Sequence, residues 1–184
     1  MENDMKKVFA ILLFLFSLPA FAQLTTAQQT TLRNYVVNNS TLNAIPHTSD
    51  GGVVVAAALN TPTASYYVTR SSVQTSQVGT NVLYTAIGAL STNNLTQLQV
   101  FVQLNPQVFV PTADVQAFFA TTFTGTLAGG GAQTRANMVM ICQRLATLAE
   151  SLLATGSGTT GSPSILGWEG SLSWQDVMSA MSWY

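Results

Sequence analysis

The stretch Thr134–Thr155, TRANMVMICQRLATLAESLLAT, constrains the fold of this chain more than any other part of it. Its apolar residues recur at steps of three and four, the spacing that gathers side chains on one face of an α-helix. Gly156 follows, and glycine commonly lies just beyond the end of a helix. The pattern predicts one long helix with a single buried face. That face comprises Met138, Ile141, Cys142, Leu145, Leu148, Ala149 and Leu152.

Two residues of this predicted face carry specific expectations. Leu145 lies near its centre, so the substitution Leu145→Ala is expected to cost ~2–5 kcal/mol of stability if the face is core. Cys142 is the only cysteine of the chain, so it has no partner for an internal disulfide. A lone cysteine among apolar neighbours usually acts as a small buried hydrophobe, and we expect Cys142 to do so.

Capping signals predict where other helices begin. Thr25 and Gln28 have the spacing of a capping box, and so do Ser173 and Asp176. Thr112 is placed to cap a further helix. Helices are predicted over about 25–37, 53–59, 76–90, 95–104, 113–123 and 174–181.

Two of these segments also fit a strand. Val53–Val55 is β-branched, and apolar residues alternate along Leu98–Leu104. We favour helix for both, because Ser49 or Asp50 can cap the first segment and the neighbours of the second are helical. Tyr66–Val73 is predicted to be extended or irregular, either half-buried or exposed as an interface patch around Arg70. The expected fold is mostly α, an irregular bundle of roughly five to seven short and medium helices with little or no sheet, forming a single helical domain over residues 23–184.

Residues 1–22 differ from the rest of the chain. Residues 5–22 read MKKVFAILLFLFSLPAFA, in which two lysines precede an apolar run and Ala20-Phe21-Ala22 forms a cleavage site. This order is typical of a secretory signal peptide. The apolar run is too short to cross a bilayer, which needs ~20 residues, so no stable membrane span is expected. The segment is predicted to be a cleaved signal peptide or, alternatively, an N-terminal hydrophobic arm.

Charge is scarce in the rest of the chain. After residue 22 there are four arginines, five acidic residues and no lysine. Such a surface offers no basic patch for nucleic acid, and we expect none to bind in that way. Few charges also mean little repulsion between copies, which permits a homo-oligomer.

Two features that could suggest chemistry are better explained as structural. His47 is the only histidine, so a metal site or a Ser-His-Asp triad would have to use it, and no G-x-S-x-G sequence is present. Gly156–Gly161 reads GSGTTG and matches G-x-G-x-x-G by letter. The dinucleotide fingerprint follows a strand and opens a helix, whereas this one follows the predicted helix and runs into Ser162-Pro163. We therefore predict no catalytic, cofactor-binding or metal-binding residue, no cofactor, and no enzymatic activity.

One segment resembles a known family. Gln143–Val177, QRLATLAESLLATGSGTTGSPSILGWEGSLSWQDV, is similar to the C-terminal signature of small proteins encoded by tailed bacteriophages and prophages. Members carry a similar R-x-A-T-x-A-E-x-L-x-A-T-G-x-G stretch, then Ser/Thr-Pro and an E-G-x-L-S-x-Q-D-V block. Leu24–Leu32 and Ala57–Pro62 resemble the same family. Members usually begin near the position of Leu24, so residues 1–22 are a departure from the pattern.

The resemblance implies a structural or assembly role in a virion, for example as a head–tail connector, in the tail or on the capsid. The implied partners are other virion proteins and further copies of the chain, and the family supplies no catalytic residues. Residues 1–22 support the alternative of an exported bacterial envelope or periplasmic helical binding protein. The expected location is the virion, or the periplasm or medium if residues 1–22 are cleaved.

Overall fold

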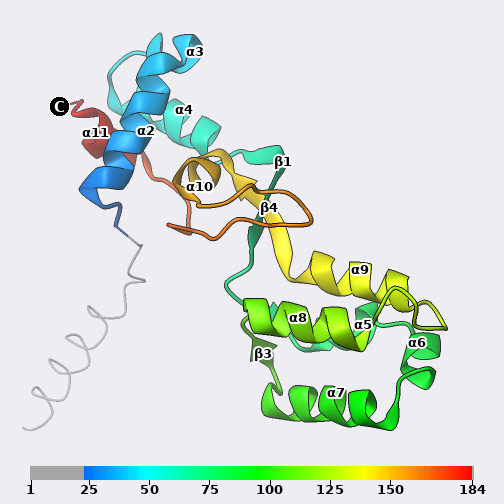
Figure 1. The fold of residues 1–184 in the computed structure, drawn as a ribbon. Helices are drawn as coiled ribbons and strands as arrows, with labels where there is room; N and C mark the ends of the chain where they lie inside the picture. Colours follow the sequence, from blue (N-terminus) through cyan, green and yellow to red (C-terminus); the bar gives the residue numbers. More distant parts are fainter. Residues whose placement is uncertain (1–22, 184) are drawn as a thin grey trace, which may run out of the picture.

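The computed structural model describes residues 23–183, so the predicted signal segment 1–22 lies outside the described residues. The described part is mostly helical, with ten helices rather than five to seven, and it contains two small antiparallel sheets of two strands each. Figure 1 shows two groups of helices joined by the long strands β1 and β4. The helices are α2 (Thr26–Asn38), α3 (Ser40–Asn43), α4 (Ser49–Leu59), α5 (Ser76–Asn81), α6 (Tyr84–Gly88), α7 (Thr92–Leu104), α8 (Ala113–Thr122), α9 (Gly131–Ile141), α10 (Leu148–Leu153) and α11 (Trp174–Met181). The strands are β1 (Pro62–Thr69), β2 (Val73–Gln74), β3 (Val108–Phe109) and β4 (Gln143–Thr147).

The predicted capping residues lie where the sequence places them. The Thr25 side chain accepts a hydrogen bond from the Gln28 amide at the start of α2, and the Gln28 side chain accepts one from the Thr25 amide. Ser173 and Asp176 form the same reciprocal pair at the start of α11. Thr112 caps α8 by accepting from the Val115 amide. These contacts satisfy backbone donors that the first turn of a helix leaves unpaired.

The segments that fitted both states are helical. Val53–Val55 belongs to α4, which begins earlier than predicted because Thr48 caps it. Leu98–Leu104 forms the second half of α7. The extended segment is also confirmed, since β1 runs to Thr69. Tertiary neighbours decide between the two states where local propensity does not.

The prediction of one long helix over Thr134–Thr155 is wrong. Helix α9 ends at Ile141, the chain continues as β4, and α10 begins at Leu148. Strand β4 pairs antiparallel with β1, with Val68 opposite Arg144. Gln, Arg, Leu and Ala are good helix formers, so pairing with β1 overrides the local helix preference of the QRLAT sequence while still satisfying its backbone groups.

The break also changes the environment of Leu145. Its side chain is 37% exposed on β4, while the neighbouring Ala146 is fully buried. Neighbouring residues of a strand point to opposite faces of the sheet, so Leu145 and Ala146 have different surroundings, which the helical stripe did not anticipate. The expected cost of Leu145→Ala is therefore corrected to below about 1 kcal/mol. Other members of the predicted face, Met138, Ile141, Cys142 and Ala149, are buried as expected.

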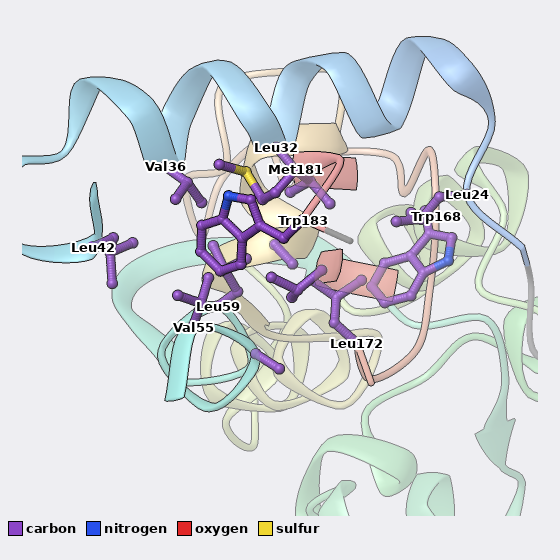
Figure 2. Packing of buried hydrophobic residues seen from close by; sticks show 13 residues of the cluster. Leu24, Leu32, Val36, Leu42, Val55, Leu59, Trp168, Leu172, Met181 and Trp183 are labelled. Atoms are coloured by element: carbon purple, nitrogen blue, oxygen red, sulfur yellow. The ribbon is translucent and has the colours of Figure 1, made fainter. Parts of the chain in front are cut away.

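The first group of helices surrounds a core that draws on both ends of the described chain. Helices α2 and α4 pack against α11, and α10 closes the same cluster. Figure 2 shows Leu32 and Val36 of α2 facing Met181 and Trp183 from the C-terminal segment. Burying side chains of this size contributes about 1.5–3 kcal/mol each before the entropy cost of ordering the chain.

The second group of helices has a separate core. It is built on α5 to α9 and the β2–β3 pair, and it includes Val73, Val78, Phe109, Phe119, Phe123 and Met138. Phe101, Phe109, Phe118 and Phe119 form a ring cluster with centroids 5.2–5.9 Å apart. Tilted and edge-on contacts at these distances are the favoured geometry for aromatic pairs. Phe119 is thus buried in the second core, and Phe118 packs against it.

Candidate functional site

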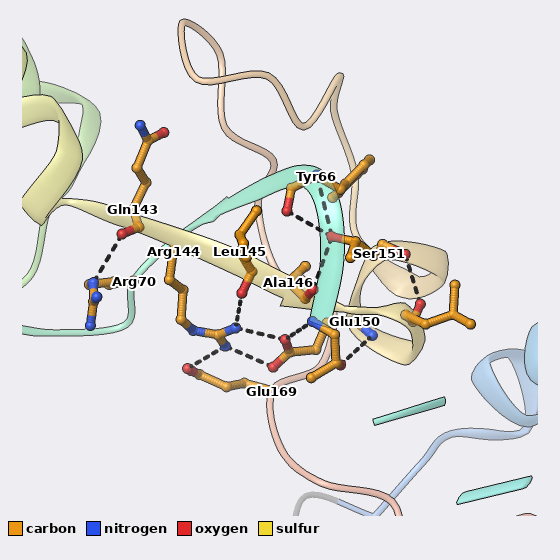
Figure 3. Close-up of polar contacts among 12 residues, drawn as sticks. Tyr66, Arg70, Gln143, Arg144, Leu145, Ala146, Glu150, Ser151 and Glu169 are labelled. Atoms are coloured by element: carbon orange, nitrogen blue, oxygen red, sulfur yellow. Dashed lines mark hydrogen bonds and ion pairs between the residues drawn. The ribbon is translucent and has the colours of Figure 1, made fainter. Parts of the chain in front are cut away.

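The polar centre of the molecule is an ion-pair network where β4, α10 and the C-terminal loop meet (Figure 3). The Arg144 guanidinium donates two hydrogen bonds of 2.7 Å, one to each carboxylate oxygen of Glu150. The same group donates to Glu169 Oε1 at 3.0 Å. Glu150 Oε2 also accepts from the Thr147 amide at 2.9 Å, which completes the capping box of α10. Arg144 on β4 therefore contacts both the first turn of α10 and the loop that carries Glu169.

The electrostatics of this network follow from burial and hydrogen bonding. The Glu150 side chain is only 2% exposed, and burial alone would raise its pKa. The hydrogen bonds from Arg144 and the backbone amides of Thr147 and Gly170 outweigh burial, so the pKa of Glu150 is lowered. The hydrogen bond to Glu150 in turn raises the pKa of Arg144. Near neutral pH Glu150 therefore stays deprotonated and Arg144 stays protonated. The ion pair holds β4 against the start of α10.

The glycine-rich loop is held against β1 rather than open to a ligand. Tyr67 donates its amide proton to the Gly158 carbonyl at 2.7 Å, and the Tyr66 hydroxyl donates to the Gly156 carbonyl at 3.3 Å. Gly158 has φ +66°, and a Cβ placed there would lie 2.5 Å from atoms of the Tyr66 ring. Farther along the loop, Ser164 pairs with β1 and donates from its hydroxyl to the Tyr66 oxygen at 2.8 Å. The glycines of GSGTTG thus permit close packing against Tyr66.

A hollow of about 700 Å³ lies between this loop and the second group of helices. Val110, Pro111, Ile165 and Trp168 give it apolar walls, and Arg70 is a charged residue in its lining. Its size falls in the range of ligand sites, which are concave and mostly apolar. Arg70 is partly committed elsewhere, since its Nε donates to the Gln143 carbonyl at 3.0 Å. Tyr66 and Arg70 therefore belong to a half-buried packed segment rather than to an exposed patch.

A second hollow of about 390 Å³ lies on the other side of Gly161, between the loop and α9. Gln143 lines it, and its Oε1 atom is buried without a hydrogen-bond donor. The side-chain nitrogen Nε2 of Gln143 donates a hydrogen bond to the Met140 sulfur at 3.4 Å. A buried acceptor without a donor is uncommon in folded proteins and costs free energy.

Cys142 and His47 take no part in the hydrogen bonds of this network. Cys142 is buried, as predicted, and burial raises the pKa of its thiol to about 11, against an opposing effect of Arg70. His47 is exposed between α3 and α4, and its ring stacks on Trp183 with centroids 4.3 Å apart and planes 15° apart.

Residues 23–183 contain neither a candidate metal-binding cluster nor a candidate membrane span. Histidine, cysteine and carboxylate side chains nowhere come together in groups of three that could hold a metal ion within that range. In the same residues, every helix is too short or too polar to cross a membrane.

Comparison with known proteins adds no assignment: no protein-family model, curated protein or solved structure matches this chain.

The ion-pair network was missed by the sequence prediction, although a signal for it was present. Thr147-Leu148-Ala149-Glu150 has the spacing of a capping box and marks a helix start inside the predicted long helix. Recognising this box would have placed the break before Leu148. The meeting of Arg144 with Glu169 could not be foreseen, because it depends on the path of a loop across 25 residues.

Proposed function

We propose that this chain is a structural or assembly protein of a bacteriophage virion that acts through protein–protein contacts. The observation that supports it best is the surface of the second group of helices. From residue 71 to residue 113 the chain has no charged side chain and no histidine. Several large apolar side chains are exposed there, among them Tyr84 at 83% and Leu104 at 76%. A neutral surface with exposed apolar groups suits lasting contact with other proteins.

The resemblance to the phage family gains a physical explanation from the ion-pair network. Three charged residues of the similar motifs, Arg144, Glu150 and Glu169, meet in one cluster. Ser173 and Asp176 of the same motifs cap α11. The motif residues therefore stabilise the architecture, which agrees with a family whose members share a scaffold. This supports a structural role over a catalytic one.

A second candidate function is an exported envelope or periplasmic binding protein. The signal-like order of residues 5–22 favours it, and the hollow of about 700 Å³ could hold a ligand. Under this proposal the processed chain begins at Gln23, since the A-x-A site ends at Ala22.

Mass spectrometry of purified phage particles from the host that carries the gene separates the two candidates. A virion protein is expected at a constant copy number in particles, and its N-terminal peptide shows whether residues 1–22 are kept. The same peptide search is run on the periplasm and the medium as the matched fractions. Recovery only from those fractions, with Gln23 as the first residue, would reject the virion proposal and support the exported protein.

A further inference from the structure

Helix α7 is attached to the molecule by one face only. Of its thirteen residues, Leu98 alone is buried, and the Phe101 ring contacts the rings of Phe109, Phe118 and Phe119. The exposed side of the helix carries Val100 at 45% and Leu104 at 76% exposed. Figure 1 shows α7 at the end of the molecule farthest from α2 and α11, with one side of the helix free of neighbouring elements.

The free face has the spacing of a helix–helix seam. Asn93, Gln97, Val100 and Leu104 are exposed and follow one another at steps of four, three and four residues. These steps place them within about 60° of the helix circumference, and the middle of this arc lies about 130° around the helix from Leu98. The same steps separate the a and d positions at which two helices pack side by side in a coiled coil. The stripe holds two amides in its first half and two apolar residues in its second.

We infer that this stripe is the contact through which a second copy of the chain associates, with the two α7 helices parallel. The inference rests on the proposed assembly function, because it names the partner of that function. In a parallel two-fold pair each residue meets its own counterpart, so amides face amides and apolar residues face apolar residues. An antiparallel pair would instead set Gln97 against Val100 and Asn93 against Leu104.

The lack of charge agrees with a second copy and disfavours a charged partner. A neutral stripe meets itself without repulsion and without removing any charge from water. A charged partner would find no opposite charge here, because no charged residue or histidine lies between Arg70 and Asp114. Amide pairs are also their own complement, since each amide both donates and accepts a hydrogen bond. Such pairs fix the register of parallel helices.

The contact is small and is expected to be weak in isolation. A helix of thirteen residues is about 20 Å long, which gives less area than the ~1,600 Å² of a stable interface. Association through α7 is therefore concentration-dependent and strengthens when many copies are held in one assembly.

The test is sedimentation equilibrium of the full chain over a wide concentration range. The substitution Leu104→Glu places like charges opposite each other and should weaken self-association at least about tenfold. Val54→Glu is the matched control, since Val54 is 54% exposed on α4 and lies outside the stripe. Mixing Leu104→Glu with Leu104→Lys should restore association, because only parallel pairing in register brings position 104 to itself. A monomeric wild-type chain, equal loss in both Glu variants, or no restoration on mixing would overturn the inference.

Disulfide cross-linking gives an independent measurement of register. Val100→Cys should form a cross-linked dimer under mild oxidation, at least about fivefold faster than Gln99→Cys, which is exposed on the side of α7. The wild-type chain is the blank, because its Cys142 is buried. Equal rates for the two variants would contradict the parallel seam.

Failure of this inference and failure of the proposed function give different results. If the chain is found in particles but α7 does not pair, the seam is wrong and the virion role stands. If α7 pairs but the chain is absent from particles, the virion role is wrong and the self-contact stands.

Discussion

Burial of the Cys142 side chain couples one thiol to the stability of the whole fold. The pKa of this thiol rises from 9.0 to about 11 in the folded chain, chiefly through removal from water. Between about pH 9 and 11 the unfolded chain loses the proton while the folded chain keeps it, so the free energy of unfolding falls as pH rises. A shift of this size corresponds to roughly 3 kcal/mol.

Urea denaturation at a series of alkaline pH values measures the Cys142 contribution. Tyrosines titrate in the same range, so the informative quantity is the difference between the wild type and Cys142→Ala. That difference should shrink steadily from about pH 9 and level off near pH 11. A constant difference across this range would mean that the thiol ionises freely in the folded state.

Gly158 and Gly161 form a matched pair of glycines in one loop. At Gly158 a Cβ would press on the Tyr66 ring, and its φ of +66° also disfavours other residues, whereas Gly161 faces open space with an ordinary φ. Gly158→Ala is expected to destabilise the chain by about 1–3 kcal/mol and Gly161→Ala by less than about 0.5 kcal/mol. Thermal unfolding followed by circular dichroism compares the two variants. Similar melting temperatures would show that the loop does not rest on Tyr66.

At the scale of single elements, the start of α10 depends on Glu150. The substitution Glu150→Gln removes the bidentate partner of Arg144 and weakens the capping box, so it should cost about 2–3 kcal/mol. Glu169→Gln is the control, because Glu169 is 41% exposed and its ion pair should be worth less than about 1 kcal/mol. The urea midpoints of the two variants are compared with that of the wild type. A larger fall in the midpoint of Glu169→Gln than of Glu150→Gln would contradict this prediction.

The Glu150 contribution also has a defined pH dependence. The pKa of Glu150 is lowered from 4.5, so its stabilising effect is complete above about pH 5 and is lost as pH falls through the lowered value. The stability difference between wild type and Glu150→Gln should therefore shrink in acid. A stability difference that grows as pH falls would contradict a lowered pKa of Glu150 in the folded chain.

The helices and strands also show which features of the fold can be predicted from the sequence and which cannot. The caps at Thr25, Thr112 and Ser173 were predictable, because each depends on residues three positions apart. The 3.6-residue period across Thr134–Thr155 was misleading, because β4 interrupts it where β1 supplies backbone partners from more than 70 residues away. Buried positions such as Met138 and Ala149 still matched, since both remain in helices, α9 and α10, on either side of β4. The hollows and the contact between Tyr66 and Gly158 depend on loop paths that no local pattern encodes.

At the scale of the whole molecule, the two hydrophobic cores differ in their aromatic residues. All three tryptophans, at positions 168, 174 and 183, follow β4 in sequence, and Trp168 and Trp183 are buried in the first core. All five phenylalanines beyond residue 22 belong to the second core. Tryptophan fluorescence therefore reports the first core, while far-ultraviolet circular dichroism reports the helices of both.

We predict that the second core unfolds at lower denaturant concentration than the first. Helix α7 buries a single residue, and exposed apolar side chains continue with Val108 in β3 and Val110 just after it. In the first core, by contrast, α11 contacts both α2 and α4, and the core includes residues from both ends of the described chain. Regions with few buried contacts open at lower free energy. The helical signal should thus begin to fall before the tryptophan emission shifts.

Leu98→Ala sharpens this prediction, because Leu98 joins α7 to the second core. It should move the early phase of the circular dichroism curve to lower denaturant concentration and leave the tryptophan transition near its wild-type midpoint. Leu32→Ala in α2 is the reciprocal variant and should lower the tryptophan midpoint. If all probes coincide in the wild type and in both variants, the two cores unfold as one cooperative unit, and the paired strands β1 and β4 transmit the loss of either core to the other.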